Sequence, residues 1–294
     1  IQELSKTHEA ISRSKTELWH RLLTHYLPLY FPEAERFRGN ARSDWFLAFL
    51  ERFPIPALIT ALEKEAFIAE AWHVVGRKVS KHRLLSDIYE SARCSVGLPV
   101  ESSSDAVRMF RMMLAEGRSL IRQRDEIERR AEAMLGGDRD YQLLRTIHSP
   151  MSLGPLARHW LIIGPINALT ILAEAGDLRR FAHHRQFLKY CGLDLSTQQS
   201  GQFRGQTKLS KFGNARLRRA LWLAGQVAIR QRDNSFRSKF ERYIARDRDN
   251  PDLRRKALSA IAAKMARTAH AVVKRGEEYR PFFEGTVPGG RTPL

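Results

Sequence analysis

The sequence predicts an all-α protein, and three observations support this prediction. Apolar residues recur three or four positions apart through most of the 294 residues, which is the spacing of a helix with one buried face. No segment alternates apolar and polar residues convincingly, as a half-buried strand would. Residues that start and stop helices stand at the ends of the periodic segments. The apolar fraction of 43% is sufficient for a sizeable core.

Residues 1–26 form the first predicted helix. Proline cannot donate a backbone hydrogen bond, so Pro28 and Pro32 are expected to end this helix. Its polar gaps and heptad spacing are typical of a coiled coil, and we expect the N-terminal helices to form a homo-oligomer. Three aliphatic residues recur every seven positions: Leu4, Ile11 and Leu18.

Further helices are predicted over 43–95 and 105–135. Two or three helical patterns share the first range, and one of them ends at Pro54. Three serines before Asp105 form an N-cap cluster for the long helix, and Gly136–Gly137 ends it. These helices make up a predicted N-terminal segment, residues 1–148, which is helical and partly coiled coil.

A second compact domain is predicted over 161–280, after an atypical linker at 149–160. Its last helix starts near Asp252 and stops at Gly276, and residues 281–294 are expected to be disordered. The other predicted helices of this domain run from Gly164–Pro165 to Gly176, over 178–193, and from an N-cap at Asn214.

Positive charge is concentrated in this second domain. The chain carries a net charge of +18 and has a pI of about 10.5. Residues 201–280 contain 21 Lys or Arg and 7 Asp or Glu, whereas residues 1–200 contain 28 and 24. A balance this basic indicates a polyanionic partner, with nucleic acid favoured over a membrane surface.

Two absences narrow the class of protein. The most apolar stretch, LIIGPINALTILAEAG, is broken by Gly, Pro, Asn and Glu and is shorter than the roughly 20 residues of a membrane span, and no signal peptide is visible. Cys94 and Cys191 form no spacing motif, which indicates reduced thiols in a cytosolic protein. We therefore expect no membrane partner.

The tract STQQSGQFRGQ, residues 196–206, separates two patterned segments and has neither helical nor strand periodicity. Its composition predicts a loop. A serine hydroxyl beside glycine, such as Ser200 before Gly201, can attack phosphorus when a base or a metal activates it. On composition alone, a polar loop without catalytic function remains the alternative.

A basic segment follows, from Arg204 to Arg219. Cations at a helix N-terminus oppose the helix dipole, and close like charges add to that cost. This density favours nucleic-acid binding over the alternative of a solvated basic face. The crowded cations are Lys208, Lys211, Arg216, Arg218 and Arg219.

Two further sequence patterns are less specific indicators of a binding site. The turn Ile163–Gly164–Pro165–Ile166 resembles the hairpin of a helix-hairpin-helix element, whose backbone N–H groups hold phosphate, but it is equally an ordinary helix start. The pair His183–His184 is of a residue type that binds metals, but neighbouring residues on a helix point in different directions, so surface histidines are the better interpretation.

The order of these motifs carries a resemblance. GP, AEAGD, a helix ending in GL, Ser-Gly after a polar spacer, K-x-S-K-x-G-N and an R-x-x-L stripe follow one another within 161–275. This order resembles the C-terminal transposase domain of the insertion-sequence 110/116/902 family, and residues 1–135 are similar to the helical segment before it. The usual Pro-Gly at the start of the hairpin is replaced by Leu161–Ile162.

The resemblance implies DNA recombination guided by a bridge RNA. In this family a serine of the C-terminal domain forms a covalent phosphoserine link with DNA, in a composite site between protomers. The matching nucleophile is Ser200, with Ser196 less favoured. The resemblance also implies nucleic-acid binding by the other residues that fall on the motif, which are Gly201, Arg204, Lys208, Ser210, Lys211, Gly213 and Asn214.

The resemblance also implies Mg²⁺, bound by four acidic residues of an RNase H-like N-terminal domain. No such segment is present in these 294 residues, so no cofactor is expected in this chain. We expect the chain by itself to bind nucleic acid without recombining it. The implied location is the bacterial cytosol, on the nucleoid when the protein is bound to DNA.

Overall fold

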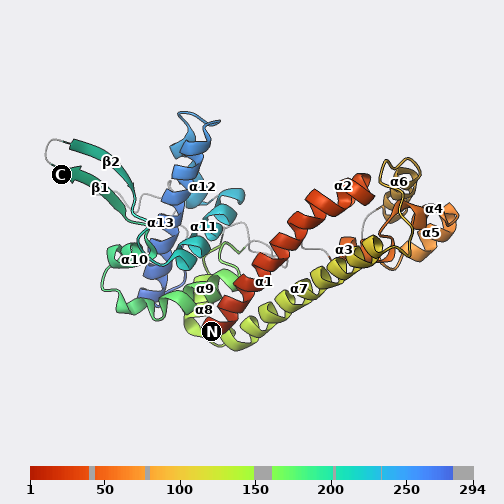
Figure 1. The fold of residues 1–294 in the computed structure, drawn as a ribbon. Coiled ribbons are helices and arrows are strands. Elements are labelled where there is room, and N and C mark those ends of the chain that lie inside the picture. The colour runs from red at the N-terminus through yellow and green to blue at the C-terminus, as the bar shows by residue number, and fades with distance from the viewer. Residues whose placement is uncertain (40–43, 77–79, 149–160, 201–202, 233, 281–294) are drawn as a thin grey trace, which may run out of the picture. The chain divides into compact units, whose positions relative to one another are not determined.

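The computed structural model describes all residues except 40–43, 77–79, 149–160, 201–202, 233 and 281–294. Most of the described residues are helical, which confirms the all-α prediction (Figure 1). The contacts divide the chain into two compact units: unit 1 comprises Ile1–Ser5 and Glu128–Leu294, and unit 2 comprises Lys6–Ile127. The predicted boundaries at 148 and 160 stay a prediction, since residues 149–160 lie outside the described residues.

Unit 2 consists of helices. It contains most of α1 (Gln2–Arg21), a π-helical turn η1 (Leu22–Tyr26), α2 (Leu27–Tyr30), a 3₁₀ helix η2 (Pro32–Phe37), α3 (Trp45–Arg52), α4 (Pro56–Thr60), α5 (Lys64–Ala71), α6 (Lys81–Arg93) and most of α7 (Asp105–Leu135). Its core is rich in aromatic rings that contact one another, among them Phe46, Phe49, Phe67 and Phe110, all fully buried.

The prediction that Pro28 ends the first helix is wrong, because the helical conformation continues past this residue. The π-helical turn η1 joins α1 directly to α2, and Pro28 lies in the first turn of α2, whose helical conformation continues to Tyr30. A wider turn before a proline relieves the clash between its ring and the carbonyl of the preceding turn, so the chain stays helical. Pro32 begins η2.

The predicted start and end of α7 are confirmed. Ser104 Oγ accepts a hydrogen bond from the Val107 backbone N–H at 3.4 Å, as an N-cap does. The helix ends at Leu135, directly before Gly136–Gly137.

Unit 1 is built around α13. Besides the first residues of the chain and the end of α7, it contains α8 (Arg139–Arg145), α9 (Pro165–Ala175), a 3₁₀ turn η5 (Leu178–Arg180), α10 (His184–Cys191), β1 (Leu195–Ser200), β2 (Phe203–Leu209), α11 (Ala215–Arg230), α12 (Ser235–Ile244) and α13 (Pro251–Arg275). α13 contacts α8, α10, α11 and α12 (Figure 1).

Small residues let α11 and α13 pack closely. Ala220, Ala224 and Ala228 are buried at four-residue intervals on α11. A stripe of alanines on α13, which includes Ala262 and Ala266, is fully buried. Since short side chains allow helix axes to approach, this pair forms the centre of the unit 1 core.

Several helices in unit 1 begin at residues that cap them through a side chain. Asn214 caps α11 and Asn250 caps α13, each accepting a backbone N–H through its side-chain oxygen. The predicted helix over 178–193 divides instead into η5 and α10, because His183 is extended and caps α10 through Nδ1. Among the described helices, none is both long and apolar enough to cross a bilayer.

Candidate nucleic-acid interface

The tract predicted as a loop forms an antiparallel hairpin, so that prediction is wrong. β1 pairs with β2 from Leu195 opposite Leu209 to Ser200 opposite Phe203. Between Thr197 and Gln199 the register shifts, because β2 has one more residue in this interval than β1. A β-bulge of this kind interrupts the alternation of side chains along a strand.

The exposure of the hairpin explains why no strand pattern announces it. Leu195 and Ser196 are neighbours in β1 and so point to opposite sides of the ribbon, yet both are exposed. A ribbon with solvent on both faces needs no apolar alternation. It forms a two-stranded sheet and extends away from the helices of unit 1 (Figure 1).

Two hydrogen bonds close the base of the hairpin. The Ser210 backbone N–H donates to the Asp194 carbonyl oxygen at 2.9 Å, and Ser210 Oγ donates to Asp194 Oδ1. These contacts occupy the Ser210 hydroxyl within the fold. Ser210 therefore anchors the hairpin, and its predicted contact with nucleic acid stays a prediction.

The turn after the hairpin is closely packed against α10. The Asn214 N–H donates to the Tyr190 carbonyl oxygen at 2.8 Å, and the Lys211 N–H donates to the Gly192 carbonyl oxygen at 3.2 Å. Gly213 has φ of +148°, and a Cβ built there would lie 2.5 Å from the Tyr190 carbonyl oxygen and 2.6 Å from the Gly192 nitrogen. This position therefore requires glycine.

Glu174 connects the two family-like motifs, AEAGD and KLSKFGN. Its Oε2 accepts a hydrogen bond from Asn214 Nδ2 at 2.7 Å, and its Oε1 accepts one from Arg216 Nη1 at 3.2 Å. Arg218 Nη1 donates to the carbonyl oxygens of Cys191 and Lys211, each at 3.1 Å. We call Glu174, Ser210, Gly213, Asn214, Arg216 and Arg218 the motif frame, because their contacts fix the hairpin and α11 to α9 and α10.

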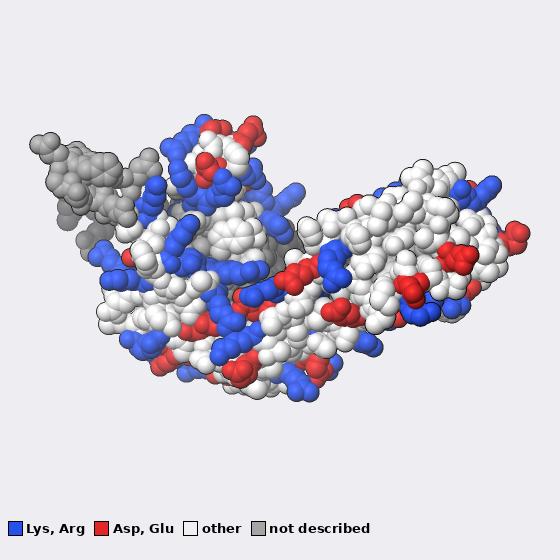
Figure 2. All heavy atoms as spheres, in the orientation of Figure 1, with Lys and Arg blue, Asp and Glu red and all other residues white. Residues whose placement is uncertain are grey.

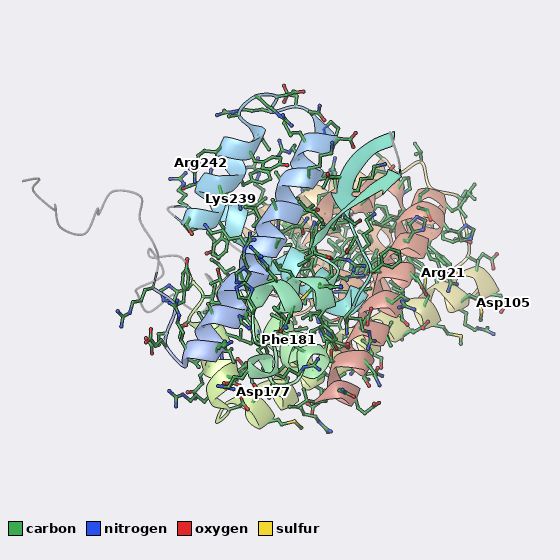
Figure 3. All side chains as sticks on the ribbon, turned by 90° about the vertical axis from the view of Figure 1, so that its left-hand side faces the viewer. Arg21, Asp105, Asp177, Phe181, Lys239 and Arg242 are labelled. Atoms are coloured by element: carbon green, nitrogen blue, oxygen red, sulfur yellow. The ribbon has the colours of Figure 1, made fainter. Side chains whose placement is uncertain are left out.

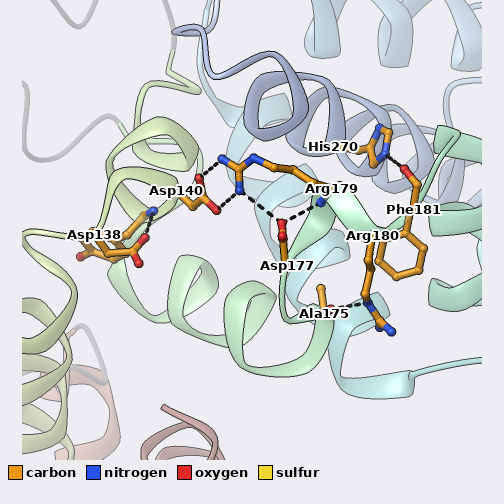
Figure 4. A network of polar contacts seen from close by, with 9 residues as sticks. Asp138, Asp140, Ala175, Asp177, Arg179, Arg180, Phe181 and His270 are labelled. Atoms are coloured by element: carbon orange, nitrogen blue, oxygen red, sulfur yellow. Dashed lines mark hydrogen bonds and ion pairs between the residues drawn. The ribbon is translucent and has the colours of Figure 1, made fainter.

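The end of α9 is fixed by a second polar network (Figure 4). Gly176 follows the helix with φ of +62° and ψ of −142°, a conformation that favours glycine. Asp177 then accepts the Arg179 backbone N–H at 2.8 Å, and the Arg179 guanidinium binds both oxygens of Asp140 on α8, at 2.6 and 2.7 Å. The hydrogen bonds to Asp140 raise the pKa of Arg179. Asp177 thus has a structural role.

The motif frame leads to a stability prediction. Glu174→Ala leaves Asn214 and Arg216 without their shared acceptor in a partly buried place, since the Glu174 side chain is 15% exposed. We expect the free energy of unfolding to fall by about 2 kcal/mol. Thermal unfolding followed by circular dichroism measures this effect. Glu90→Ala is the matched control, because Glu90 forms an exposed pair with Lys64 and should change little. Equal melting temperatures for the two variants would contradict the role of Glu174.

A basic groove begins at the base of the hairpin. Its volume is about 1290 Å³, and α10, the hairpin base, α12 and α13 line it. Helix α10 contributes Arg185 and Lys189, which are four residues apart, and the hairpin base contributes Lys208 and Lys211. Among the described residues, none of these four cations is paired with a carboxylate.

The opposite side of the groove is also cationic. Lys239 lies on α12, and Arg255, Lys256 and Arg267 share one face of α13. Arg255 contacts Asp252, one of two acidic residues in the lining. Figure 3 shows Lys239 and Arg242 on α12, and Figure 2 shows Lys and Arg gathered over α12, α13 and the adjoining part of unit 1.

The positive charges in the groove affect one another. Burial lowers the pKa of Lys239, and the charges of Arg267 and Arg242 lower it further. Burial also lowers the pKa of His184, followed by the charges of His183, Arg267 and Arg185. The contributions of the neighbouring charges, which are smaller than that of burial, indicate positive potential in this region, and an anion would relieve the repulsion.

The predicted binding residues divide into three groups. Lys208 and Lys211 line the groove. Ser210, Gly213, Asn214, Arg216 and Arg218 belong to the motif frame. Gly164 is the N-cap of α9 and Arg219 is an exposed residue of α11, and neither lines the groove.

The hairpin residues at the opposite end from the groove are described in part. Arg204 pairs with Gln199 through the backbone, and Ser200 is the last residue of β1. The side chains of Ser200 and Arg204, and all of Gly201, lie outside the described residues.

Sequence reasoning missed half of the groove. The missed residues contribute to the charge of residues 201–280 but stand outside the motifs that predict binding; they are Lys239, Arg255, Lys256 and Arg267. A signal was present on α13, where the lining residues recur three or four positions apart from Asp252 to Arg267. That stripe combines charged and small residues, so it does not resemble the apolar stripe of a core helix.

A cationic groove on a helical scaffold, with a polar two-stranded ribbon at its edge, is typical of a nucleic-acid-binding protein. Residues 162–241 match the model of the transposase IS116/IS110/IS902 family, so the chain carries a domain of this family. Such a domain implies DNA binding and a function in transposition by DNA recombination. The match contains the hairpin and the motif frame. No protein in the curated collection searched matches the chain.

Proposed function

We propose that the chain acts as the DNA-binding and nucleophile-bearing part of a transposase. The observation that supports this proposal is the hairpin, because its first residue, Leu195, lines the basic groove and its strand β1 ends at Ser200. DNA bound by its phosphates in the groove would lie close to the strand that carries the serine. The cations would offset the negative charge of the phosphates that are brought together.

The proposed chemistry is a transesterification. Ser200 Oγ attacks a phosphorus atom of DNA, an Oγ–P bond forms, and the P–O bond to the leaving sugar oxygen breaks. The hydroxyl proton of the serine passes through solvent to that oxygen. One phosphodiester replaces another, so the step needs neither an oxidant nor a reductant. A later attack by a sugar hydroxyl on the phosphoserine would release the protein and rejoin DNA.

Two partners follow from the family and belong to the proposal. A bridge RNA would pair donor and target DNA, and a second protomer would complete a composite site. The magnesium that the family implies would be held by its acidic domain, and among the described residues of this chain no three His, Cys, Asp or Glu side chains converge on one point.

A non-catalytic nucleic-acid-binding module is the second candidate. The observation that favours it is the position of the groove relative to Ser200. Among the described residues, the hairpin contributes lining residues at its base, such as Leu195, and β1 ends at Ser200, five residues further along. Such a module would bind phosphates with little sequence preference and would be indifferent to loss of the serine.

Salt-dependent DNA binding tests the groove with two arginines of one helix. Arg267 lines the groove, whereas Arg254 on α13 is exposed outside the lining and donates to the Arg248 carbonyl oxygen. We expect Arg267→Gln to reduce the slope of log affinity against log salt by about 1, because one phosphate contact is lost. Fluorescence anisotropy with a duplex oligonucleotide at several salt concentrations measures the slope.

Arg254→Gln carries the same loss of charge and serves as the control, with an unchanged slope expected. If both variants lost the same affinity, binding would depend on net charge rather than on the groove. That result would remove the support for both candidate functions at this site.

A further inference from the structure

The floor of the basic groove is shaped by small residues. Ser259, Ala260 and Ala263 line it along α13, with Arg255 and Lys256 at one end and Arg267 at the other. Twelve residues of helix separate Arg255 from Arg267, which is about 18 Å. The floor is therefore a hollow with cations at both ends, whereas a binding surface for duplex backbone needs only outward-pointing cations.

The walls of the groove contain exposed apolar groups. Tyr243 on α12 is 39% exposed and stands one helical turn after Lys239, so the ring and the ammonium group lie on one face. Leu195, at the start of β1, is 71% exposed in the same lining. Exposed apolar side chains in a concave site indicate a ligand with an apolar face as well as charge.

Single-stranded nucleic acid has both properties. Its phosphates attract cations, and its unpaired bases offer faces that stack on aromatic rings. In a duplex the bases are stacked on one another, so a ring in a groove finds no base face to cover. An acidic peptide would satisfy the cations but would leave Tyr243 without a partner. The combination of an aromatic ring, a small-residue floor and terminal cations therefore favours an unpaired strand.

We propose that the groove holds a short segment of single-stranded DNA, with one base stacked on Tyr243 and its phosphates near Lys239 and Arg267. The choice of DNA rests on the proposed function, in which Ser200 attacks a DNA strand. Leu195 and Ser200 are five residues apart on β1, about 17 Å in an extended strand. A strand in the groove would thus lie only a few nucleotides from the phosphate presented to the serine.

Binding of a fluorescent thymidine oligonucleotide to the whole chain tests the proposal. We expect Tyr243→Ala to weaken binding roughly tenfold, since stacking of a single base contributes about that much. Tyr243→Phe keeps the ring and should bind like the unmodified chain. A duplex of the same length should lose less than about twofold with Tyr243→Ala, because its bases are not available for stacking.

Phe212→Ala is the matched control. Phe212 is 84% exposed beside Lys211 but does not line the groove, so its removal should leave binding of the oligonucleotide unchanged. Thermal unfolding of every variant shows that the fold is retained. An oligonucleotide that carries 5-iodouracil provides a second measurement, because irradiation should cross-link it to the peptide that contains Tyr243.

Several outcomes would overturn the proposal. Unchanged affinity of Tyr243→Ala, an equal loss for duplex and single strand, or cross-linking elsewhere would show that Tyr243 does not stack on a base. Tighter binding of a uridine ribonucleotide of equal length would assign the groove to RNA. Displacement of the oligonucleotide by polyglutamate at equal charge would indicate a general anion surface. A selective Tyr243 effect, together with a complete transposase that forms no serine adduct with DNA, would instead uphold the groove and reject the nucleophile.

Discussion

Replacing Ser200 with alanine is expected to abolish the covalent protein–DNA adduct of a complete transposase that contains this chain, while DNA binding remains. The reason is chemical: the methyl group of alanine has no oxygen to attack phosphorus, but the groove cations Lys208, Lys239 and Arg267 are unchanged. Denaturing electrophoresis of protein mixed with labelled DNA detects the adduct, and anisotropy measures the binding that should persist.

Ser196→Ala is the control for this prediction. Ser196 lies in the same strand, opposite Lys208, and its side chain is exposed near the base of the hairpin. The adduct should form normally in this variant. An adduct that survives Ser200→Ala but disappears with Ser196→Ala would move the nucleophile to the base of the hairpin, and survival in both variants would reject both serines of β1 as the nucleophile.

Replacing Gly213 with alanine is expected to cause the largest loss of stability, about 3 kcal/mol or more. A φ of +148° is strained for any residue with a Cβ, and the atoms that the Cβ would meet are backbone atoms of Tyr190 and Gly192. Backbone cannot turn aside as a flexible side chain can. The turn between β2 and α11 must therefore shift, and the hydrogen bonds of Asn214 shift with it.

Chemical denaturation followed by circular dichroism measures this loss. Gly137→Ala is the matched control, because a Cβ there meets nothing within 4 Å and the residue is not among those with positive φ. We expect Gly137→Ala to change the free energy of unfolding by less than about 0.5 kcal/mol. Should Gly213→Ala prove as stable as this control, the close packing of the turn would be incorrect.

Gly213 and Lys211 show the difference between the motif frame and the groove surface. Gly213 belongs to the motif frame and does not line the groove, so Gly213→Ala should weaken DNA binding only through displacement of the hairpin base. Lys211, two residues earlier, lines the groove. Neighbouring residues of one sequence motif therefore have different roles, one in packing and one in lining the groove. The motif alone does not distinguish these roles.

Much of the fold follows from local signals. Ser104, Asn214 and Asn250 have side chains that accept the first free N–H groups of a helix, and Gly276 follows α13 in the left-handed conformation. These effects act within one turn of helix. They can be read from the sequence because they need no distant partner.

Other features depend on distant partners. Glu174 gives no sign in the sequence that it will bind Asn214 and Arg216, which lie 40 and 42 residues away. The expectation that Asn214, Arg216 and Arg218 bind nucleic acid stays a prediction, to which the structure adds contacts that the sequence does not indicate. Their polar groups are directed into the fold, toward Glu174 or toward the carbonyl oxygens of Cys191 and Lys211.

The sequence by itself determined the helical class, most helix ends, the concentration of positive charge after residue 201 and the family of the domain over 162–241. Only the tertiary structure decided that the polar tract is a hairpin and that a groove exists. The base of the ribbon is exposed on both faces and the ribbon carries a bulge, so burial imposes no alternation there. The groove assembles cations from α10, α12 and α13, which become neighbours only when the helices pack.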